Sequence, residues 1–448
     1  MKNNIVLFIT GCTLMLMASC LGSGETYSTD DIKDAQIASL TLSHDSVAGL
    51  ENVKFTIDQV SGLIFNNDSL PYGTKIEKVV CTLTYSVGVS AIKVEQKAEG
   101  DTAIWWNGTD SLNFALPIAF TTIAYDGATS KNYTAWVNIH QEKPDSMVWQ
   151  FYATLPEADA RERNTIKYTY NGSEAYLMYT KTSAGANLYY APTHYMDTWQ
   201  ELPLADLPQT TDITQIAAYE CTLYAPADGE GLYQSDNGLT WTKTENAPPV
   251  KTILGVISEQ RNGPPLLAVI LKGETADVFA SMNRENQWTE GDTVPGNFPR
   301  NGFAHISYTR MNSAYLSVVA GKNAEAQPLN TTWTTSNGTA WALLSGEEEN
   351  FFEKKSGAML AQYDDKFYLI GGIHADNKAS KDIHLSVDNG ATWFPVDSLK
   401  TLPESYQSRG YASVDVNEEK YLLLFGGKTS EDGKSLNELW RGRINRLK

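Results

Sequence analysis

The sequence has few cysteines and few basic residues for its length. It holds 4 cysteines in 448 residues, and its 53 acidic residues outnumber 35 lysines and arginines, which gives a net charge of −18. This charge argues against nucleic acid and anionic membrane surfaces as partners. Cys81 and Cys221 fall in different predicted domains, so we expect no disulfide between them. Both lie in apolar strand contexts, which predicts two buried free thiols.

Motifs for common enzymatic chemistry are also missing. The 6 histidines form neither an HExxH motif nor a paired cluster, and His374 and His384 are separated by a predicted loop. The glycine pairs at 371–372 and 426–427 end predicted strands and are not followed by helices, so they do not resemble phosphate-binding loops. No serine-hydrolase elbow is present. We therefore expect no metal centre and no cofactor.

The longest apolar run is short and lies at the N-terminus. It covers residues 5–17, about 13 residues, whereas a membrane-spanning helix needs about 20. A basic start precedes it and Ala18-Ser19-Cys20 follows it, which is typical of a secretory signal that ends in a lipobox. The pattern predicts a signal peptide over residues 1–19, acylation of Cys20 and a flexible tether over residues 20–31. The alternative is an ordinary signal peptide with an incidental cysteine.

Strand-type patterns dominate the rest of the chain. Short apolar or alternating runs, rich in Val, Ile, Thr and aromatic residues, are separated by Gly, Asn and Asp. No segment keeps a helical period over 12 or more residues, which predicts an all-β protein. In residues 119–137, two alternating segments flank Asp126-Gly127, which is typical of a hairpin. We predict a first domain over residues 32–143, with a charged boundary that contains Pro144.

Tryptophans recur at regular intervals in the last two thirds of the chain. They stand at positions 149, 199, 241, 288, 341 and 393, so that neighbours are 42 to 53 residues apart, the length of one propeller blade. Residues 386–393 read SVDNGATW, and weaker copies precede three other tryptophans. We expect each copy to be a hairpin turn in which Asp accepts hydrogen bonds, Gly supplies a positive φ and Trp packs between sheets. In the two best copies these residues are Asp236, Gly238, Trp241, Asp388, Gly390 and Trp393.

A second repeated element is an apolar strand that closes on glycine. It is present as residues 368–372 (YLIGG) and 421–427 (YLLLFGG), and more weakly as residues 315–321 (YLSVVAG). The last repeat lacks its fourth strand, and residues 147–151 match the sequence around Trp393. We therefore predict that this early strand pairs with the last repeat, since propellers avoid exposed strand edges in this way.

These motifs resemble known families. The SVDNGATW motif resembles the Asp box, or BNR repeat, and the strand with its glycine pair resembles the second strand of a Kelch blade. The lipobox, the acidic end of the tether and the hairpin at 119–137 resemble Bacteroides-type surface lipoproteins. The resemblance implies an immunoglobulin-like β-sandwich over residues 32–143 and a six-bladed β-propeller over residues 147–448. It also implies a place in the cell envelope, at the outer membrane and exposed on the surface.

Asp boxes also occur in sialidases, which are six-bladed propellers. These enzymes resemble one another in three arginines that grip the substrate carboxylate and in a tyrosine nucleophile paired with glutamate. Arg163, Arg300 and Arg409 could converge, but Phe298-Pro299-Arg300 does not follow the order of the sialidase motif. We interpret the chain as a non-catalytic binding or scaffolding protein for a glycan or protein ligand. A sialidase-type glycosidase is the alternative.

The ligand is expected on the face opposite the Asp boxes. In a propeller, the loops that enter first strands and those that join second to third strands emerge together around the channel. A ring of basic groups there would concentrate anionic or hydroxyl-rich ligands. The alternative is that the same residues are separate charges paired with nearby acids. The candidate ligand-binding residues are Arg163, Arg300, Lys355, Arg409, His374 and Lys428.

Overall fold

The structure is a computed structural model that describes residues 33–97, 102–108, 110–259, 263–346 and 351–446. The predicted signal peptide, Cys20 and tether lie outside these residues. Regular structure in the described part is β-strand, apart from two short 3-10 helices, η2 (Leu50–Asn52) and η4 (Ile213–Gln215). A search of that part finds no apolar helix of membrane-spanning length. The chain divides into two compact units, one that ends at Pro144 and one that begins at Asp145.

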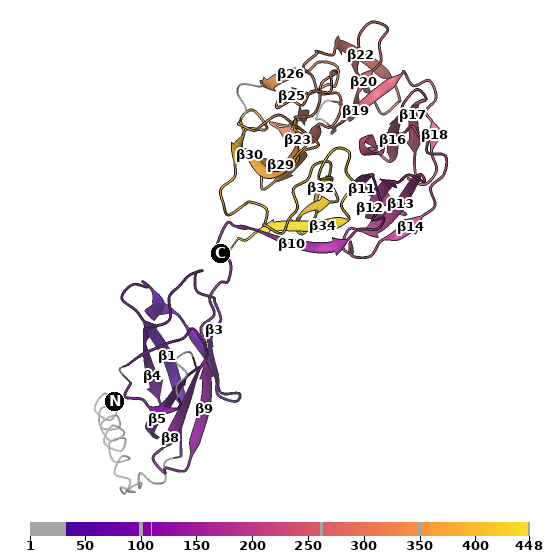
Figure 1. The fold of residues 1–448 in the computed structure, drawn as a ribbon. Helices are drawn as coiled ribbons and strands as arrows, with labels where there is room; N and C mark the ends of the chain where they lie inside the picture. Colours follow the sequence, from indigo (N-terminus) through magenta and orange to yellow (C-terminus); the bar gives the residue numbers. More distant parts are fainter. Residues whose placement is uncertain (1–32, 98–101, 109, 260–262, 347–350, 447–448) are drawn as a thin grey trace, which may run out of the picture. The chain divides into compact units, whose positions relative to one another are not determined.

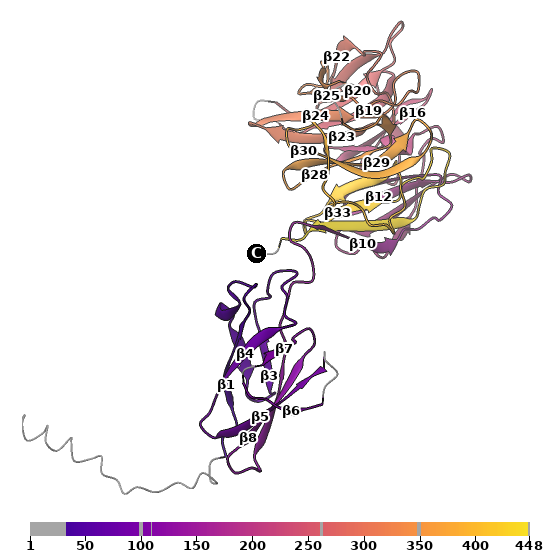
Figure 2. The ribbon, with the colours of Figure 1, turned by 60° about the vertical axis from the view of Figure 1, so that its left-hand side comes forward.

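The first unit consists of two facing sheets, as Figure 2 shows. The smaller sheet has the strand order β1 (Ile37–Ser43), β4 (Val79–Tyr85), β7 (Ser111–Leu112). The larger sheet has the order β2 (Phe55–Asp58), β3 (Leu63–Asn66), β9 (Ser130–Ala135), β8 (Ile118–Ala124), β5 (Val89–Gln96), β6 (Ile104–Trp105). Both sheets contribute to one core, with Leu42 and Cys81 from the smaller sheet and Phe120 from the larger.

The hairpin expected at residues 119–137 is present as β8 and β9, which pair antiparallel. Every second residue of β8 is buried, as expected for a strand with one face on a core. In the turn, the Asp126 side chain accepts hydrogen bonds from the amides of Ala128 (3.0 Å) and Thr129 (2.7 Å). Gly127 has a φ of 67°, which glycine adopts without steric cost.

The two described cysteines differ in their surroundings. Cys81 is buried in β4, as predicted, and desolvation raises the pKa of its thiol to about 12. The prediction that Cys221 is buried was wrong, because this residue is exposed. It follows Glu220, whose φ of 55° places it in the turn between two strands rather than within one.

The second unit contains six sheets in its described residues, numbered here in chain order. Sheet 1 is β11 (Glu162–Tyr170), β12 (Ser173–Lys181), β13 (Ala186–Pro192) and β14 (Gln200–Leu202). Sheet 2 is β15 (Ala217–Tyr219), β16 (Thr222–Ala227), β17 (Gly231–Ser235) and β18 (Thr242–Lys243). Sheet 3 is β19 (Val250–Ile257), β20 (Leu266–Leu271), β21 (Val278–Met282) and β22 (Trp288–Thr293). Sheet 4 is β23 (Ala304–Arg310), β24 (Ser313–Val319), β25 (Thr332–Thr335) and β26 (Ala342–Ser345).

The last two sheets have additional strands or strands from distant parts of the chain. Sheet 5 is β27 (Lys355–Ser356), β28 (Met359–Tyr363), β29 (Lys366–His374), β30 (Ala379–Ser386) and β31 (Phe394–Pro395). Sheet 6 is β32 (Ser413–Val416), β33 (Leu422–Phe425), β34 (Glu438–Ile444) and β10 (Met147–Thr154). The first and last strands of the unit are therefore neighbours, as Figure 1 shows. Trp149 lies opposite Gly442, where a Cβ would come within 2.5 Å of the Trp149 ring.

The six first strands contact one another in a closed series. In order these strands are β11, β15, β19, β23, β28 and β32, and β32 again contacts β11. Figure 1 shows the sheets arranged around a common centre. Each first strand pairs with a single strand of its own sheet, so its inner edge carries backbone groups that no strand of the sheet satisfies.

The turn after β30 of sheet 5, at residues 386–393, has the hydrogen bonds expected from its sequence SVDNGATW. The Asp388 carboxylate accepts hydrogen bonds from the Thr392 amide (2.9 Å), the Thr392 hydroxyl (2.6 Å) and the Ser386 hydroxyl (2.8 Å). These bonds lower the pKa of Asp388 against the opposing effect of desolvation. Asp388 is thus the acceptor that holds this turn together.

The corresponding turn in sheet 2 corrects one assignment. Asn237, not Asp236, accepts hydrogen bonds from the amides of Leu239 (2.8 Å) and Thr240 (3.0 Å). The Asp236 side chain instead accepts a hydrogen bond from the Thr222 hydroxyl at 2.7 Å. This turn is one residue shorter between its serine and its glycine than that of sheet 5, so the acceptor position falls on the next residue.

These turns pack against the preceding sheet. Gly238 has a φ of 74°, and a Cβ there would lie 2.6 Å from Leu177 of sheet 1. Among the described residues, Trp241 and Trp393 are the largest fully buried side chains, at 1% and 0% exposure. Gly390, with a φ of 93°, occupies the same place before Trp393. The repeated motif therefore joins successive sheets.

Candidate functional site

Arg163 and Arg409 lie inside the second unit. The Arg163 guanidinium donates hydrogen bonds to the carbonyls of Pro156 (2.7 Å) and Glu157 (2.8 Å). The Arg409 guanidinium, which is fully buried, donates to the Gly426 carbonyl (3.0 Å) and to the Glu438 carboxylate (2.5 Å). Burial is the main cause that lowers the pKa of Arg163 to about 10. Both guanidinium groups thus have hydrogen-bond partners within the protein.

Lys355 and Arg300 are engaged in the same way. Lys355 is fully buried, and its Nζ donates a hydrogen bond of 3.1 Å to the Gly371 carbonyl. Desolvation is the main cause that lowers its pKa to about 8. Arg300 donates to the Asp277 carboxylate at 2.9 Å, and its side chain is 11% exposed.

The glycine pairs provide the space for three of these side chains. A Cβ at Gly372 would lie 2.7 Å from Cδ of Lys355, and one at Gly427 would lie 2.9 Å from Cδ of Arg409. A Cβ at Gly426 would lie 2.8 Å from Cδ of Arg163. Lys355, Arg409 and Arg163 therefore each pack against a glycine of these pairs, in space that a larger residue would fill.

The remaining two candidates lie nearer the surface. His374 Nδ1 lies 3.4 Å from the Glu353 carboxylate, and the His374 side chain is 20% exposed. Lys428 Nζ lies 5.9 Å from the centre of the Tyr411 ring. The structure thus separates the six predicted residues into four interior cations and two residues nearer the surface, which differs from the expected ring of solvent-facing charges.

A tyrosine and a glutamate do meet where the loops enter the first strands. Tyr411 hydrogen-bonds to Ser356 and to Glu431, and Glu431 also pairs with Lys322 at 2.5 Å. Burial raises the pKa of Tyr411 to about 12. The three arginines do not converge on this pair, since each is anchored to neighbouring backbone or acidic groups.

A cavity of about 500 Å³ lies where the six first strands meet. We call it the axial channel. All six sheets contribute to its lining, mostly through their first strands or the residues just before them. The lining comprises 163–167, 212 and 214–218, 253 and 255–256, 301–307, 357–360 and 411–415.

Polar side chains of the channel satisfy the inner edges of neighbouring first strands. The Ser413 hydroxyl of sheet 6 accepts a hydrogen bond of 2.8 Å from the Thr165 amide of sheet 1. The side-chain oxygen Oε1 of Gln215 accepts a hydrogen bond of 3.1 Å from the Ile253 amide of sheet 3. Because an unpaired buried amide is costly, these contacts explain polar residues in the interior.

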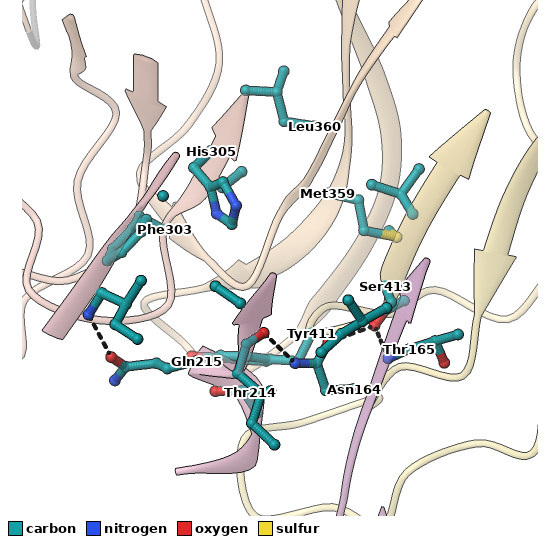
Figure 3. Close-up of a pocket in the computed structure, with 18 of the residues that line it drawn as sticks. Asn164, Thr165, Thr214, Gln215, Phe303, His305, Met359, Leu360, Tyr411 and Ser413 are labelled. Carbon is teal, nitrogen blue, oxygen red and sulfur yellow. Dashed lines mark hydrogen bonds between the residues drawn. The ribbon is translucent and has the colours of Figure 1, made fainter. Parts of the chain in front are cut away.

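The channel has two chemically different walls, visible in Figure 3. The upper part of that view holds the side chains of Phe303, His305, Met359 and Leu360. The lower part holds the ring of Tyr411 together with amides and hydroxyls, which come from Asn164, Thr165, Thr214, Gln215 and Ser413.

His305 is the titratable group of the aromatic wall. Its side chain is open to the channel, and its ring lies 6.3 Å from that of Phe303 in an edge-on arrangement. Desolvation by the surrounding protein lowers the pKa of the imidazole. The imidazole of His305 has no hydrogen-bond partner among the described residues. The buried Thr165 hydroxyl has none there either.

Sequence reasoning missed most of the channel. His305 lies near the start of first strand β23, just after Gly302, and the corresponding strand of sheet 5, β28, likewise comes just after a glycine, Gly357. That shared position was the available signal, because inner strands of a propeller surround its axis. Histidine spacing alone gave no reason to select His305 from the six.

These features define the second unit as a β-propeller, and comparison with known families agrees. Residues 143–448 match the family model described as the DUF6242 beta propeller domain, and residues 25–137 match the DUF6242 N-terminal domain. The chain belongs to this family. No curated protein matches it. Among solved structures, one titled "Structure of YjhT" is similar over 64% of this chain and 96% of that chain, at 15% identity and a TM-score of 0.46.

Proposed function

We propose that the chain is a non-catalytic binding protein of the bacterial cell surface whose propeller takes a ligand in the axial channel. One observation carries the proposal: all six sheets converge on a cavity of about 500 Å³. Small-molecule sites usually measure roughly 300–1,000 Å³ and combine an apolar lining with a few placed polar groups. The two walls of the channel provide both.

The proposal includes the architecture around this site. Each of the six sheets is one blade, with Kelch-like second strands and Asp-box turns, and β10 completes the last blade. The first unit is an immunoglobulin-like spacer, and acylated Cys20 tethers the protein to the outer membrane. The closed series of first-strand contacts and the lipobox support these points.

The sialidase-type alternative is less well supported. A tyrosine nucleophile has to lose its proton, whereas burial raises the pKa of Tyr411 to about 12. Arg163 and Arg409 are buried and hydrogen-bonded within the protein, so they cannot grip a substrate carboxylate without breaking these contacts. We therefore place binding, rather than glycoside cleavage, in the channel.

The test uses a defined panel of small molecules and a variant that fills the channel. The panel contains methyl glycosides of common hexoses, their uronic acid counterparts, and the amino acids, and binding to the full chain is measured by saturation-transfer NMR. Thr214 lines the channel and is exposed, so Thr214→Trp adds bulk there without disturbing a packed core. Thr289 is also exposed, on outer strand β22, which makes Thr289→Trp the matched control.

The proposal predicts that at least one panel member binds, that Thr214→Trp abolishes its signal, and that Thr289→Trp preserves it. Equal binding by both variants would place the ligand elsewhere. Release of a hydrolysed aglycone from any glycoside in the panel would instead favour the enzyme.

A further inference from the structure

The charged groups along the axial channel are already paired within the protein. The Asp212 carboxylate accepts hydrogen bonds from the Thr214 amide (3.0 Å) and the Gln215 side-chain amide (2.9 Å). The Asp415 carboxylate accepts one from the Tyr176 hydroxyl at 2.5 Å. A charged ligand would have to compete with these contacts.

The basic side chains that line the channel also have partners within the protein. Lys167 Nζ lies 3.0 Å from the Glu174 carboxylate, and the Arg163 guanidinium donates to two backbone carbonyls. A ligand carboxylate would therefore lose its hydration without gaining an uncommitted cation among the lining residues. That loss is costly, because a buried charge without a partner is strongly unfavourable.

The two walls of the channel suit a ligand ring that has one face of low polarity and hydroxyl groups around its edge. Phe303 and His305 present ring surfaces on one side of the channel, against which the C–H face of a saturated ring can pack. The opposite side holds the Thr165 hydroxyl, which has no partner among the described residues, together with strand edges whose backbone groups are neutral donors and acceptors. Hydroxyls can both donate to and accept from such groups.

His305 is the residue best placed to select the ligand. A neutral imidazole offers one donor and one acceptor, and neither has a recorded partner among the described residues. Desolvation lowers the pKa of His305, which keeps it neutral at physiological pH. The other titratable groups that line the channel are Arg163, Lys167, Asp212, Asp415 and Tyr411.

We infer that the ligand is an uncharged, hydroxylated ring of monosaccharide size, and that His305 makes the hydrogen bond that selects it. This inference rests on the proposed function, since it names the ligand class of the same channel. It differs from the anionic ligand that a ring of solvent-facing cations would favour.

The first experiment compares matched pairs that differ only in charge. Titration calorimetry on the full chain uses the methyl glycosides of glucose and galactose beside the methyl glycosides of glucuronic and galacturonic acid. We expect a neutral glycoside to bind at least tenfold more tightly than its uronate. Equal or tighter binding of a uronate would overturn the inference, and the proposed function would stand if Thr214→Trp removed that binding.

The second experiment tests His305 with the neutral glycoside that binds. His305→Phe keeps a ring of similar size and removes both nitrogens, and His305→Gln keeps a donor and an acceptor. We expect a loss of about tenfold for His305→Phe and partial recovery for His305→Gln. His194 is exposed in a loop outside the channel lining, so His194→Phe is the control and should bind as the unaltered chain does.

Folding is checked by thermal unfolding of each variant before titration. Unchanged affinity in His305→Phe would overturn the role of His305. Failure of both neutral glycosides to bind would overturn the ligand class. If an amino acid from the wider panel then bound in a manner sensitive to Thr214→Trp, the proposed function would survive that failure.

Discussion

Trp393 Nε1 donates a hydrogen bond of 3.1 Å to the hydroxyl of Thr332, which belongs to the preceding sheet. The same nitrogen lies 3.1 Å from the Gly390 carbonyl of its own turn. The contact joins sheets 4 and 5 through a fully buried indole. The SVDNGATW turn at residues 386–393 thus connects neighbouring sheets.

Loss of the acceptor in this turn should lower stability and leave binding intact. Asp388→Ala removes a carboxylate that accepts three hydrogen bonds, so we expect about 1–3 kcal/mol less free energy of unfolding. Asp388→Asn retains one acceptor oxygen and should lose less. Denaturant unfolding measures the change. An Asp388→Ala protein of unaltered stability would contradict the structural role.

Lys355 should be dispensable for stability. Lys355→Met replaces a buried ammonium with an apolar chain of similar length, which removes the cost of burying a charge. In the unaltered chain, the free energy of unfolding should rise with pH between about 8 and 10.5, because the folded state releases the Lys355 proton first. Lys355→Met should lose this rise, whereas exposed Lys378→Met should keep it. A large loss of stability in Lys355→Met would show that the ammonium is required.

His384 should make the protein sensitive to acid. Desolvation, with a smaller effect from Lys355, lowers its pKa to about 4 from an ordinary 6.5. The unfolded chain therefore binds the proton first, and stability falls as pH drops from 6.5 towards 4, by up to roughly 3 kcal/mol. Unfolding midpoints of His384→Gln and the unaltered chain across this range test the point. If the stability of both proteins fell equally with pH, His384 would not be the cause of the acid sensitivity.

The β10 strand should be required for the propeller to fold. It pairs with β34 from Met147 to Thr154, so its removal exposes a strand edge in sheet 6. A chain that begins at residue 155 should aggregate, while one that begins at residue 144 should remain monomeric. Size-exclusion chromatography distinguishes them, and monomers of equal stability would refute the requirement.

Cys20→Ala should release the protein from the membrane, since acylation of this cysteine is the proposed anchor. Fractionation of cells that express each form measures the distribution. Membrane association that persists in Cys20→Ala would count against the anchor.

Sequence patterns located the elements better than they located side chains. The contexts of Trp149 and Trp393 matched because both lie in an outermost strand region, and β10 indeed pairs with β34. Turn-forming residues in the sequence predicted the positions of these hairpin turns, but a one-residue difference in length moved the acceptor from Asp236 to Asn237. Local spacing does not report such a shift until the hydrogen bonds are known.

The basic residues show why the site itself was harder to predict. Arg409 and Lys355 do stand near the starts of first strands, yet both turn inwards onto glycine pairs. The space over Gly372 and Gly427 exists because glycine lacks a Cβ, and only the three-dimensional arrangement shows which side chain fills it. His305 faces the channel for an equally non-local reason, namely the closed series of first strands.

A crystal structure of the full chain soaked with the panel glycoside that binds most tightly would locate the ligand. We expect electron density for the sugar within the axial channel, with a hydroxyl in hydrogen-bond distance of His305. Density for the sugar at the turns that precede Trp241 and Trp393 or on the first unit, with an empty channel, would refute the proposed site.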